Sequence, residues 1–199
     1  MRRRWLALAA PLLLSACGYN RIQTYDEQAS AAKQQISVQL QRRADLIGNL
    51  VATVKGQAAQ ELQVFTQVAQ ARAGLVGALQ KGDPREMANA NEQLTTATRG
   101  LMIAVEAYPQ LKSDQAFLRL QDELTGTENR IAVARNDYNG AVQQYNTLIR
   151  GFPVVITAKV VGAKPREYFE VTDASAREAP KVDFGTPATV PPAPVESNK

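Results

Sequence analysis

The sequence predicts an all-α protein: an antiparallel up-and-down bundle of four long helical segments, the first two of which could be continuous, followed by a disordered tail. Three observations support this prediction. Apolar residues recur at alternating spacings of three and four, which gives the seven-residue repeat of packed antiparallel helices. The middle of the chain contains only two prolines, Pro84 and Pro109. The 199 residues, 45% of them hydrophobic, suffice for one domain with a substantial core.

The first half of the bundle is expected to supply two segments, over residues 21–55 and 57–80. Gly56 is the only visible interruption between them, and a glycine inside a helix costs only about 1 kcal/mol relative to alanine. The pattern therefore leaves open whether these segments are two helices or one long helix. Apolar or small residues keep a helical spacing throughout: Ile22, Tyr25, Ala29, Ala32, Ile36, Leu40, Ile47, Leu50, Val54, Ala58, Leu62, Phe65 and Ala69.

A third helix is predicted to begin at Pro84 and to end near Tyr108. Asp83 can cap its first turn, proline suits the first helical position, and Glu86 can reach back to complete a capping box. Pro109 ends the helix because proline disfavours helical geometry in the residue before it.

The last helix is expected to start after a cap at Ser113 or Asp114 and to end at residues 151–153. Residues 153–172 carry apolar patches and are expected to fold back onto the bundle. Residues 173–199 are rich in proline with few large apolar side chains, so we expect them to be disordered. The seam of the last helix is the most regular in the chain: Phe117, Leu120, Leu124, Thr127, Ile131, Ala134, Tyr138, Ala141, Tyr145, Leu148 and Phe152.

The chain begins with a pattern typical of a bacterial lipoprotein precursor. Three arginines, at residues 2–4, precede an apolar stretch from Trp5 to Leu14. That stretch is too short for a membrane-spanning helix, which needs about 20 residues. The next residues, LSAC at 14–17, resemble a lipobox and contain Cys17, the only cysteine.

We therefore expect residues 1–16 to be a signal peptide and the bundle domain to occupy residues 17–152. Acyl chains on Cys17 would tether the protein to a membrane, since two or three chains hold firmly where one does not. Gly18 follows where aspartate is the usual signal for retention in the inner membrane, which favours the outer membrane and a periplasm-facing domain. An ordinary signal peptide cut near Ala16, with an incidental cysteine, stays open as the alternative.

The composition excludes several classes of chemistry. The chain has no histidine and no thiol beyond Cys17, so it lacks the usual ligands of zinc, copper and non-haem iron and the base that activates serine or cysteine nucleophiles. We expect no catalytic residues, no metal site and no cofactor. Without the three leader arginines, 20 basic residues face 19 acidic ones, so no nucleic-acid partner is expected.

Charged residues fall on or beside the seams of the first and last helices, where apolar residues are expected. Arg42 can pair with Asp45, but Arg43, at a core position of the repeat, has no acid three or four residues away. The charged residues of interest are Arg42, Arg43, Asp45, Glu128, Arg130 and Arg135. The three in the last helix lack partners within that helix.

If the first and last helices run antiparallel, Arg43 and Arg130 come out at similar heights. An ion pair between Arg43 and Glu128, with Asp45 reaching Arg130, would form a polar layer that adds little net stability but can fix helix register. Two alternatives stay open. The arginine stems could cover the seam while their heads reach solvent, or the charges could line a ligand pocket.

Four stretches carry a family resemblance: QRRADLIGNLVATVKG at 41–56, ARA at 71–73, the block at 108–153 that contains TENRIAVAR, and PREYFEV at 165–171. Over residues 18–172 the chain resembles the LemA family of bacterial envelope proteins. The resemblance implies an antiparallel helical bundle held at a membrane by its N-terminus, with no agreed activity and no catalytic residues.

Three features depart from this family pattern. Many members carry a longer N-terminal transmembrane helix where this chain has the lipobox. Lys33 and Gly48 stand where members often have tryptophan and proline.

Three classes of function fit these residues to different degrees. We favour a non-enzymatic, lipid-anchored envelope protein that acts as a structural or protein-interaction module, with protein partners in the envelope. The second is a helical bundle that binds a small ligand or a lipid in a cavity between its helices. The third is an enzyme that uses paired carboxylates, and the candidate acids for it are Glu61, Glu106, Glu123 and Glu128.

Overall fold

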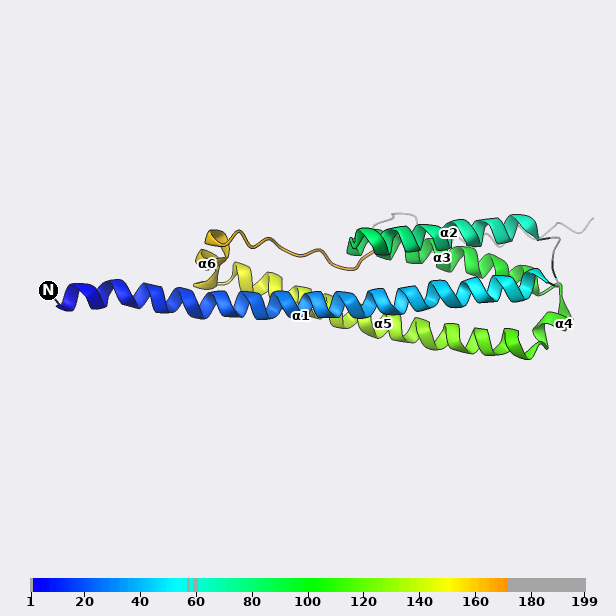
Figure 1. Cartoon of the computed structure of the whole chain (residues 1–199), viewed down its shortest axis with the longest axis horizontal. Coiled ribbons are helices and arrows are strands. Elements are labelled where there is room, and N and C mark those ends of the chain that lie inside the picture. Colours follow the sequence, from blue (N-terminus) through cyan, green and yellow to red (C-terminus); the bar gives the residue numbers. More distant parts are fainter. Residues whose placement is uncertain (1, 57, 59–60, 172–199) are drawn as a thin grey trace, which may run out of the picture.

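Six helices and one extended segment make up the described part of the chain (Figure 1). The computed structural model describes residues 2–56, 58 and 61–171, with residues 2–17 described by their backbone alone. The helices are α1 (Arg2–Lys55), α2 (Leu62–Lys81), α3 (Pro84–Val105), α4 (Pro109–Lys112), α5 (Gln115–Arg150) and α6 (Val154–Val160). Helices are the only regular elements in these ranges, which confirms the all-α prediction. The expected disordered tail, residues 173–199, lies outside the described residues.

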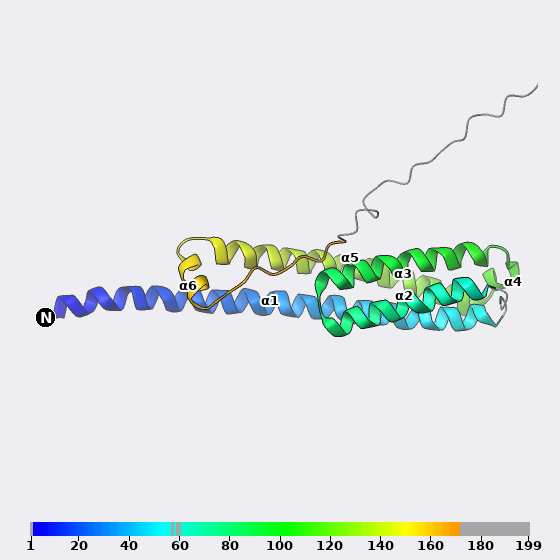
Figure 2. The same ribbon diagram turned by 90° about the horizontal axis from the view of Figure 1, so that it is seen from above.

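The antiparallel pair of α1 and α5 forms the long axis of the molecule and has the most extensive interface. The hairpin of α2 and α3 covers only one half of this pair, at the end where α1 finishes (Figures 1 and 2). Over the other half lie α6 and an extended segment, residues 163–171, which we call the strap. The bundle therefore has four helices at one end and two helices with a cover at the other.

The helical backbone is interrupted between α1 and α2, so the first half of the bundle forms two helices. α1 ends at Lys55 and α2 begins only at Leu62, later than the expected start at residue 57. Ala58 is buried in the core, and its backbone N–H donates to the carbonyl of Val54 at 2.9 Å, which holds the turn against α1. At its other end α1 begins at Arg2, so helical backbone continues through the expected leader.

The two aspartate caps act as predicted, but the expected capping box does not form, because the Glu86 carboxylate pairs with Lys81 at 2.9 Å instead. The Asp83 carboxylate accepts backbone hydrogen bonds from Arg85 and Glu86, at 2.8 and 3.1 Å, and starts α3. The Asp114 carboxylate does the same for α5.

The end of α3 differs slightly from the expectation. The helix stops at Val105, before the predicted end near Tyr108, because the next three N–H groups bond to carbonyls three residues back in a tighter turn. Pro109 then opens the short α4, which the sequence pattern did not predict.

Within the described part of the chain the strap has no strand partner, and asparagine side chains of α5 bond to its backbone instead. The Asn146 amide donates to the Arg166 carbonyl at 2.9 Å and accepts from the Arg166 N–H at 2.8 Å. The Asn139 amide makes the same two bonds with Phe169, at 3.3 and 2.9 Å. Seven residues of helix and three residues of extended chain both span about 10 Å, so the two asparagines match the strap in register.

Side chains clamp the strap across both long helices. Arg166 forms a bidentate pair with Asp26 of α1, at 2.8 and 2.9 Å, and lies over the Tyr145 ring at 5.8 Å. Tyr138, which is buried, donates its hydroxyl to the Glu167 carbonyl at 2.7 Å. Burial raises the pKa of Tyr138 to about 12, so this hydroxyl stays protonated. Phe169 is buried in the main core, so the strap is part of the fold.

The clamp between Asp26 and Arg166 predicts a pH-dependent contribution to stability. The hydrogen bonds from Arg166 hold the pKa of Asp26 below its ordinary value, so stability from this pair is present at neutral pH and is lost as the pH falls through the folded-state pKa. We expect Asp26→Asn to lower the free energy of unfolding at pH 7 by about 1 kcal/mol. The difference from the unchanged protein should persist down to about pH 4 and shrink below it, as measured by urea unfolding.

Glu27→Gln provides the matched control, because this neighbouring carboxylate is exposed. That variant should unfold like the unchanged protein at pH 7. A difference for Asp26→Asn that stays constant down to pH values well below about 4 would contradict the assigned ion pair.

Candidate functional site

Arg43 connects three helices from a position inside the core. Only 3% of the residue is exposed. Its guanidinium donates from Nη2 to the Glu128 carboxylate of α5 at 2.7 Å and from Nη1 to the Asn91 side-chain carbonyl of α3, also at 2.7 Å. The expected contact between Arg43 and Glu128 is therefore present, and the head of Arg43 does not reach solvent.

The two partners of the ion pair between Arg43 and Glu128 differ in their exposure to solvent. Burial lowers the pKa of Arg43, and the nearby Glu128 and Glu92 oppose this shift. The Glu128 side chain is about half exposed, whereas Arg43 Nε is buried without a hydrogen-bond partner. A pair of this kind adds little net stability, because removing the arginine from water offsets much of the attraction.

The other predicted members of the polar layer contact different residues from those expected. Asp45 accepts a hydrogen bond from Gln41 and lies 3.7 Å from Arg72 of α2, so the predicted bridge from Asp45 to Arg130 is wrong. Arg130 instead donates to Thr127 at 3.2 Å. The reason is helical geometry. Asp45 lies two residues after Arg43, and residues two apart in a helix point in directions about 200° apart around its axis. When Arg43 faces Glu128 of α5, Asp45 therefore faces away from α5.

The two remaining arginines lie at the surface. Arg42 pairs with Glu123 at 3.6 Å, not with Asp45, and both partners are about half exposed. Arg135 is exposed and has no hydrogen bond or ion pair within the described ranges. For these two arginines the solvent-facing alternative describes the structure.

Gly48 lies where α2 crosses α1. Arg72 donates from Nε to the Ala44 carbonyl at 2.7 Å, and a Cβ on Gly48 would approach that nitrogen to 3.2 Å. A proline at position 48 would deprive the Ala44 carbonyl of its helical partner, and Arg72 already donates to this carbonyl. Lys33, at the second unusual position, donates to the Gly82 carbonyl at 3.2 Å and supports the turn between α2 and α3.

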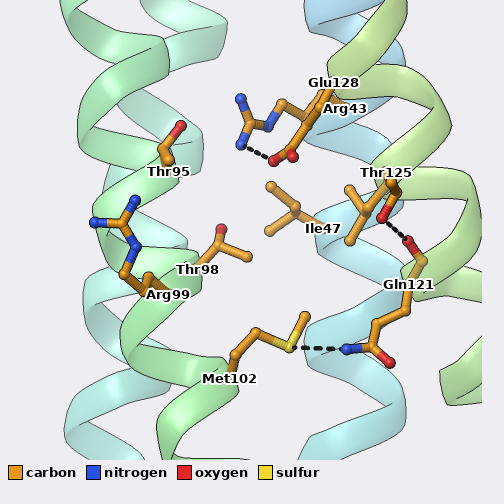
Figure 3. A pocket seen from close by; sticks show the side chains of 10 residues that line it. Arg43, Ile47, Thr95, Thr98, Arg99, Met102, Gln121, Thr125 and Glu128 are labelled. Atoms are coloured by element: carbon orange, nitrogen blue, oxygen red, sulfur yellow. Dashed lines mark hydrogen bonds and ion pairs between the residues drawn. The ribbon is translucent and has the colours of Figure 1, made fainter.

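A cavity of about 270 Å³ lies beside Arg43, between α1, α3 and α5 (Figure 3). It forms because α3 and α5 stay farther apart than the other neighbouring helices. Arg99, Thr95 and Thr98 project from α3 on one side of it. Many of its polar groups are already bonded: Thr98 to its own helix, Gln121 to the sulfur of Met102, and Glu128 to Arg43.

The acids considered for catalysis are spread along the bundle. Glu61 accepts from the Tyr108 hydroxyl at 3.2 Å, while Glu123 and Glu128 face arginines. Glu106 caps the end of α3. No group of three or more cysteine or acidic side chains is arranged to hold a metal ion within the described residues.

Cys17 belongs to α1, and its side chain lies outside what the structure describes. The next residue, Gly18, is buried against α6, where a Cβ would lie 3.2 Å from the Thr157 hydroxyl. The tertiary packing of the bundle therefore begins at the residue after Cys17. None of the helices, over the residues described, is both long and apolar enough to cross a membrane.

The sequence pattern missed several residues of these sites. Asn91 lies four residues after Met87 and three before Leu94, so its spacing along the seam of α3 could have identified it. Asn146, which is buried, could have been noticed as a polar residue beside the seam of α5. No local signal joins Asp26 to Arg166, because 140 residues separate them.

Glu128→Ala is expected to destabilise the protein more than Arg43→Met. The first change leaves a buried guanidinium without its counter-charge, and we expect a loss of about 2–3 kcal/mol, reduced from the full penalty because Glu128 is half exposed. The second removes the charge and keeps an unbranched apolar side chain, so the change should stay within about 1 kcal/mol. Urea unfolding followed by circular dichroism measures both values.

The double variant should be no less stable than Glu128→Ala alone, because no uncompensated charge remains in it. Glu123→Ala is the matched control, since Glu123 forms an exposed pair with Arg42, and its effect should stay within about 0.5 kcal/mol. Equal losses for Glu128→Ala and Glu123→Ala would argue against a special role for the buried pair.

Comparison with known proteins gives consistent results. Residues 32–184 match the LemA family. The chain is 30% identical over 188 residues to the magnetosome proteins MamQ 1 and MamQ 2 of Paramagnetospirillum magneticum (strain AMB-1), which covers 83% of this chain and 68% of each relative. It is also 30% identical over 190 residues to the magnetosome protein MamQ of Magnetospirillum gryphiswaldense (strain MSR-1), covering 82% and 69%. The chain therefore belongs to the LemA family, as its sequence motifs indicated.

Proposed function

We propose that this protein is a non-enzymatic component of the bacterial envelope, anchored by acyl chains on Cys17 and facing the periplasm, with the outer membrane as the favoured location. It acts as a structural or protein-interaction module. Its helical body presents long, rigid surfaces to neighbouring proteins, and its role requires no cofactor.

The observation that carries this proposal is the position of Cys17 relative to the folded body. The lipobox-like residues 14–17 end where packing begins, since Gly18 already lies against α6. Acyl chains on Cys17 would therefore hold the bundle directly at the membrane surface with little linker between them. Two or three chains give stable attachment without a spanning helix.

The lack of usual catalytic groups supports the non-enzymatic part of the proposal. The chain contains no histidine, and three of the four candidate acids have a cation or a hydroxyl donor as partner.

A shallow groove between α1 and α5 is the surface that best fits a protein partner. Its volume is about 410 Å³, and it is lined by Gln35, Gln39 and Val133 among others. Gln39 Oε1 is buried there without a hydrogen-bond partner, and Val133 is 60% exposed. Val38 of α1 is also exposed. Arg43 and Glu128 are paired and so mark the same level on the antiparallel helices α1 and α5. Val38 lies five residues before Arg43 and Val133 five residues after Glu128, so the two valines lie at the same level along the bundle.

The cavity beside Arg43 supports the alternative function, binding of a small ligand, less well. Its volume of about 270 Å³ is small for a ligand site, and most of its polar groups are bonded to protein. We therefore place the interaction surface on the outside of the bundle.

Replacing Cys17 tests the anchor. In Cys17→Ser cells we expect the precursor to stay uncleaved and to incorporate no alkyne-tagged fatty acid, because serine offers no thiol for acylation. Tyr19→Ser, two residues downstream, is the matched control and should be processed and labelled normally. A Cys17→Ser protein that is still cut to the mature size would identify an ordinary signal peptide and overturn the proposed anchor.

Photo-crosslinking in cells tests the groove. A benzoylphenylalanine at Asn129, which lines the groove beside Val133, should form a discrete adduct with an envelope protein. We expect Val133→Asp to reduce this adduct about tenfold, because a charge on the contact surface would have to be buried. The same substitution at Ile103, equally exposed but on α3, should leave the adduct unchanged. Equal yields in all three proteins would exclude the groove as the contact surface.

A further inference from the structure

α6 exposes apolar side chains on the face that a surface helix normally keeps polar. Its inner face is accounted for, because Val154 and Ala158 pack on α1 and α5. Ile156 and Val160, one turn apart on the outer face, are 59% and 82% exposed. Phe152, in the turn before α6, is 85% exposed, which is the largest value among the exposed large apolar residues described.

The charged residues nearest to α6, up to the ion pair of Asp26 and Arg166, are all basic. Residues 18–25 of α1 and residues 138–164, which include α6, contain no aspartate or glutamate. They contain four basic residues, all exposed: Arg21, Arg150, Lys159 and Lys164. An apolar surface with a basic border fits a bilayer that contains anionic lipids, where apolar groups enter the headgroup boundary and cations meet phosphates.

This surface lies at the level of the expected lipid attachment. A Cβ on Gly18 would approach Thr157 and Val154 of α6 to 3.2 and 3.8 Å, so α6 sits beside the residue that follows Cys17. Figures 1 and 2 place α6 at the end of the bundle from which α1 continues toward the N-terminus. A membrane that holds Cys17 is therefore within reach of α6.

We propose that Phe152, Ile156 and Val160 form a lipid-contacting cap that inserts into the headgroup boundary of the membrane beside the anchor. The proposal rests on the proposed attachment through Cys17 and adds an orientation to it. The basic residues around the cap face lipid phosphates. With both contacts in place, the bundle stands on the membrane by the α6 end, with the α2–α3 hairpin directed away.

Tryptophan fluorescence tests the cap in the mature lipoprotein. Trp5, the only tryptophan, lies in the expected signal peptide, so the mature protein is a silent background into which Phe152→Trp is introduced. Phe152 is exposed, so this change does not disturb packing. The purified lipoprotein is reconstituted in vesicles of phosphatidylethanolamine and phosphatidylglycerol, with or without bromine on the acyl chains. We expect bromine to quench the emission about twofold or more, because the side chain lies in the acyl boundary.

Val133→Trp in the same background is the matched control. Val133 is also exposed but lies in the middle of α5, so its emission should not respond to bromine. Flotation of the vesicles reports the anchor separately. Protein that floats while Phe152→Trp is quenched no more than Val133→Trp would overturn the cap and leave the anchor standing.

Two other outcomes would overturn the lipid-contacting cap, the first of them together with the anchor at Cys17. Failure of the lipoprotein to float would overturn the anchor and the cap together. A blue-shifted Phe152→Trp emission that bromine does not quench, with crosslinks through position 152 between two copies, would assign this surface to a protein contact and overturn the cap.

Discussion

The unequal lengths of the helices determine how the rest of the structure is built. α5 has 36 residues and is about 54 Å long, whereas α2 and α3 have 20 and 22 residues and reach only about 30 Å. The apolar seam of α5 continues past the end of the hairpin, through Tyr138 and Tyr145 to Ile149. Exposing that seam would lose roughly 1.5–3 kcal/mol per large side chain, so another part of the chain has to cover it. α6 and the strap do so, and their packing follows from this length mismatch.

Features that depend on residues close together in the chain could be predicted from the sequence, whereas contacts between distant segments could be predicted only in part. Asp83 and Asp114 act through neighbours two or three residues away, so their caps could be recognised locally. The pair of Arg43 and Glu128 was one of three arrangements that the sequence left open, and it could be considered at all because antiparallel helices of known ends fix the heights of their residues. The direction of Asp45 did not follow, since height alone does not tell which neighbouring helix a side chain faces.

The strap shows the limit more clearly. Its backbone is held by Asn139 and Asn146, whose spacing repeats the seven-residue period of α5, but nothing in that period says that an extended segment will lie there. The clamp from Arg166 to Asp26 joins two segments that are 140 residues apart in the chain, and it carries no local signal. The sequence therefore predicted that residues 153–172 fold back, and the side chains that hold them emerged only from the structure.

The two ends of the bundle meet different physical demands. At the end where α1 finishes, four helices surround the core, and Arg43 connects α1, α3 and α5 there. Its buried charge adds little net stability. Its two short hydrogen bonds, however, would lengthen if one helix slid past another, so they fix the positions of the three helices along the bundle. At the α6 end, the large apolar side chains of Phe152, Ile156 and Val160 lie outside the core and are exposed. Beside the proposed anchor at Cys17, such an apolar face with a basic border would match the surface of a membrane that contains anionic lipids.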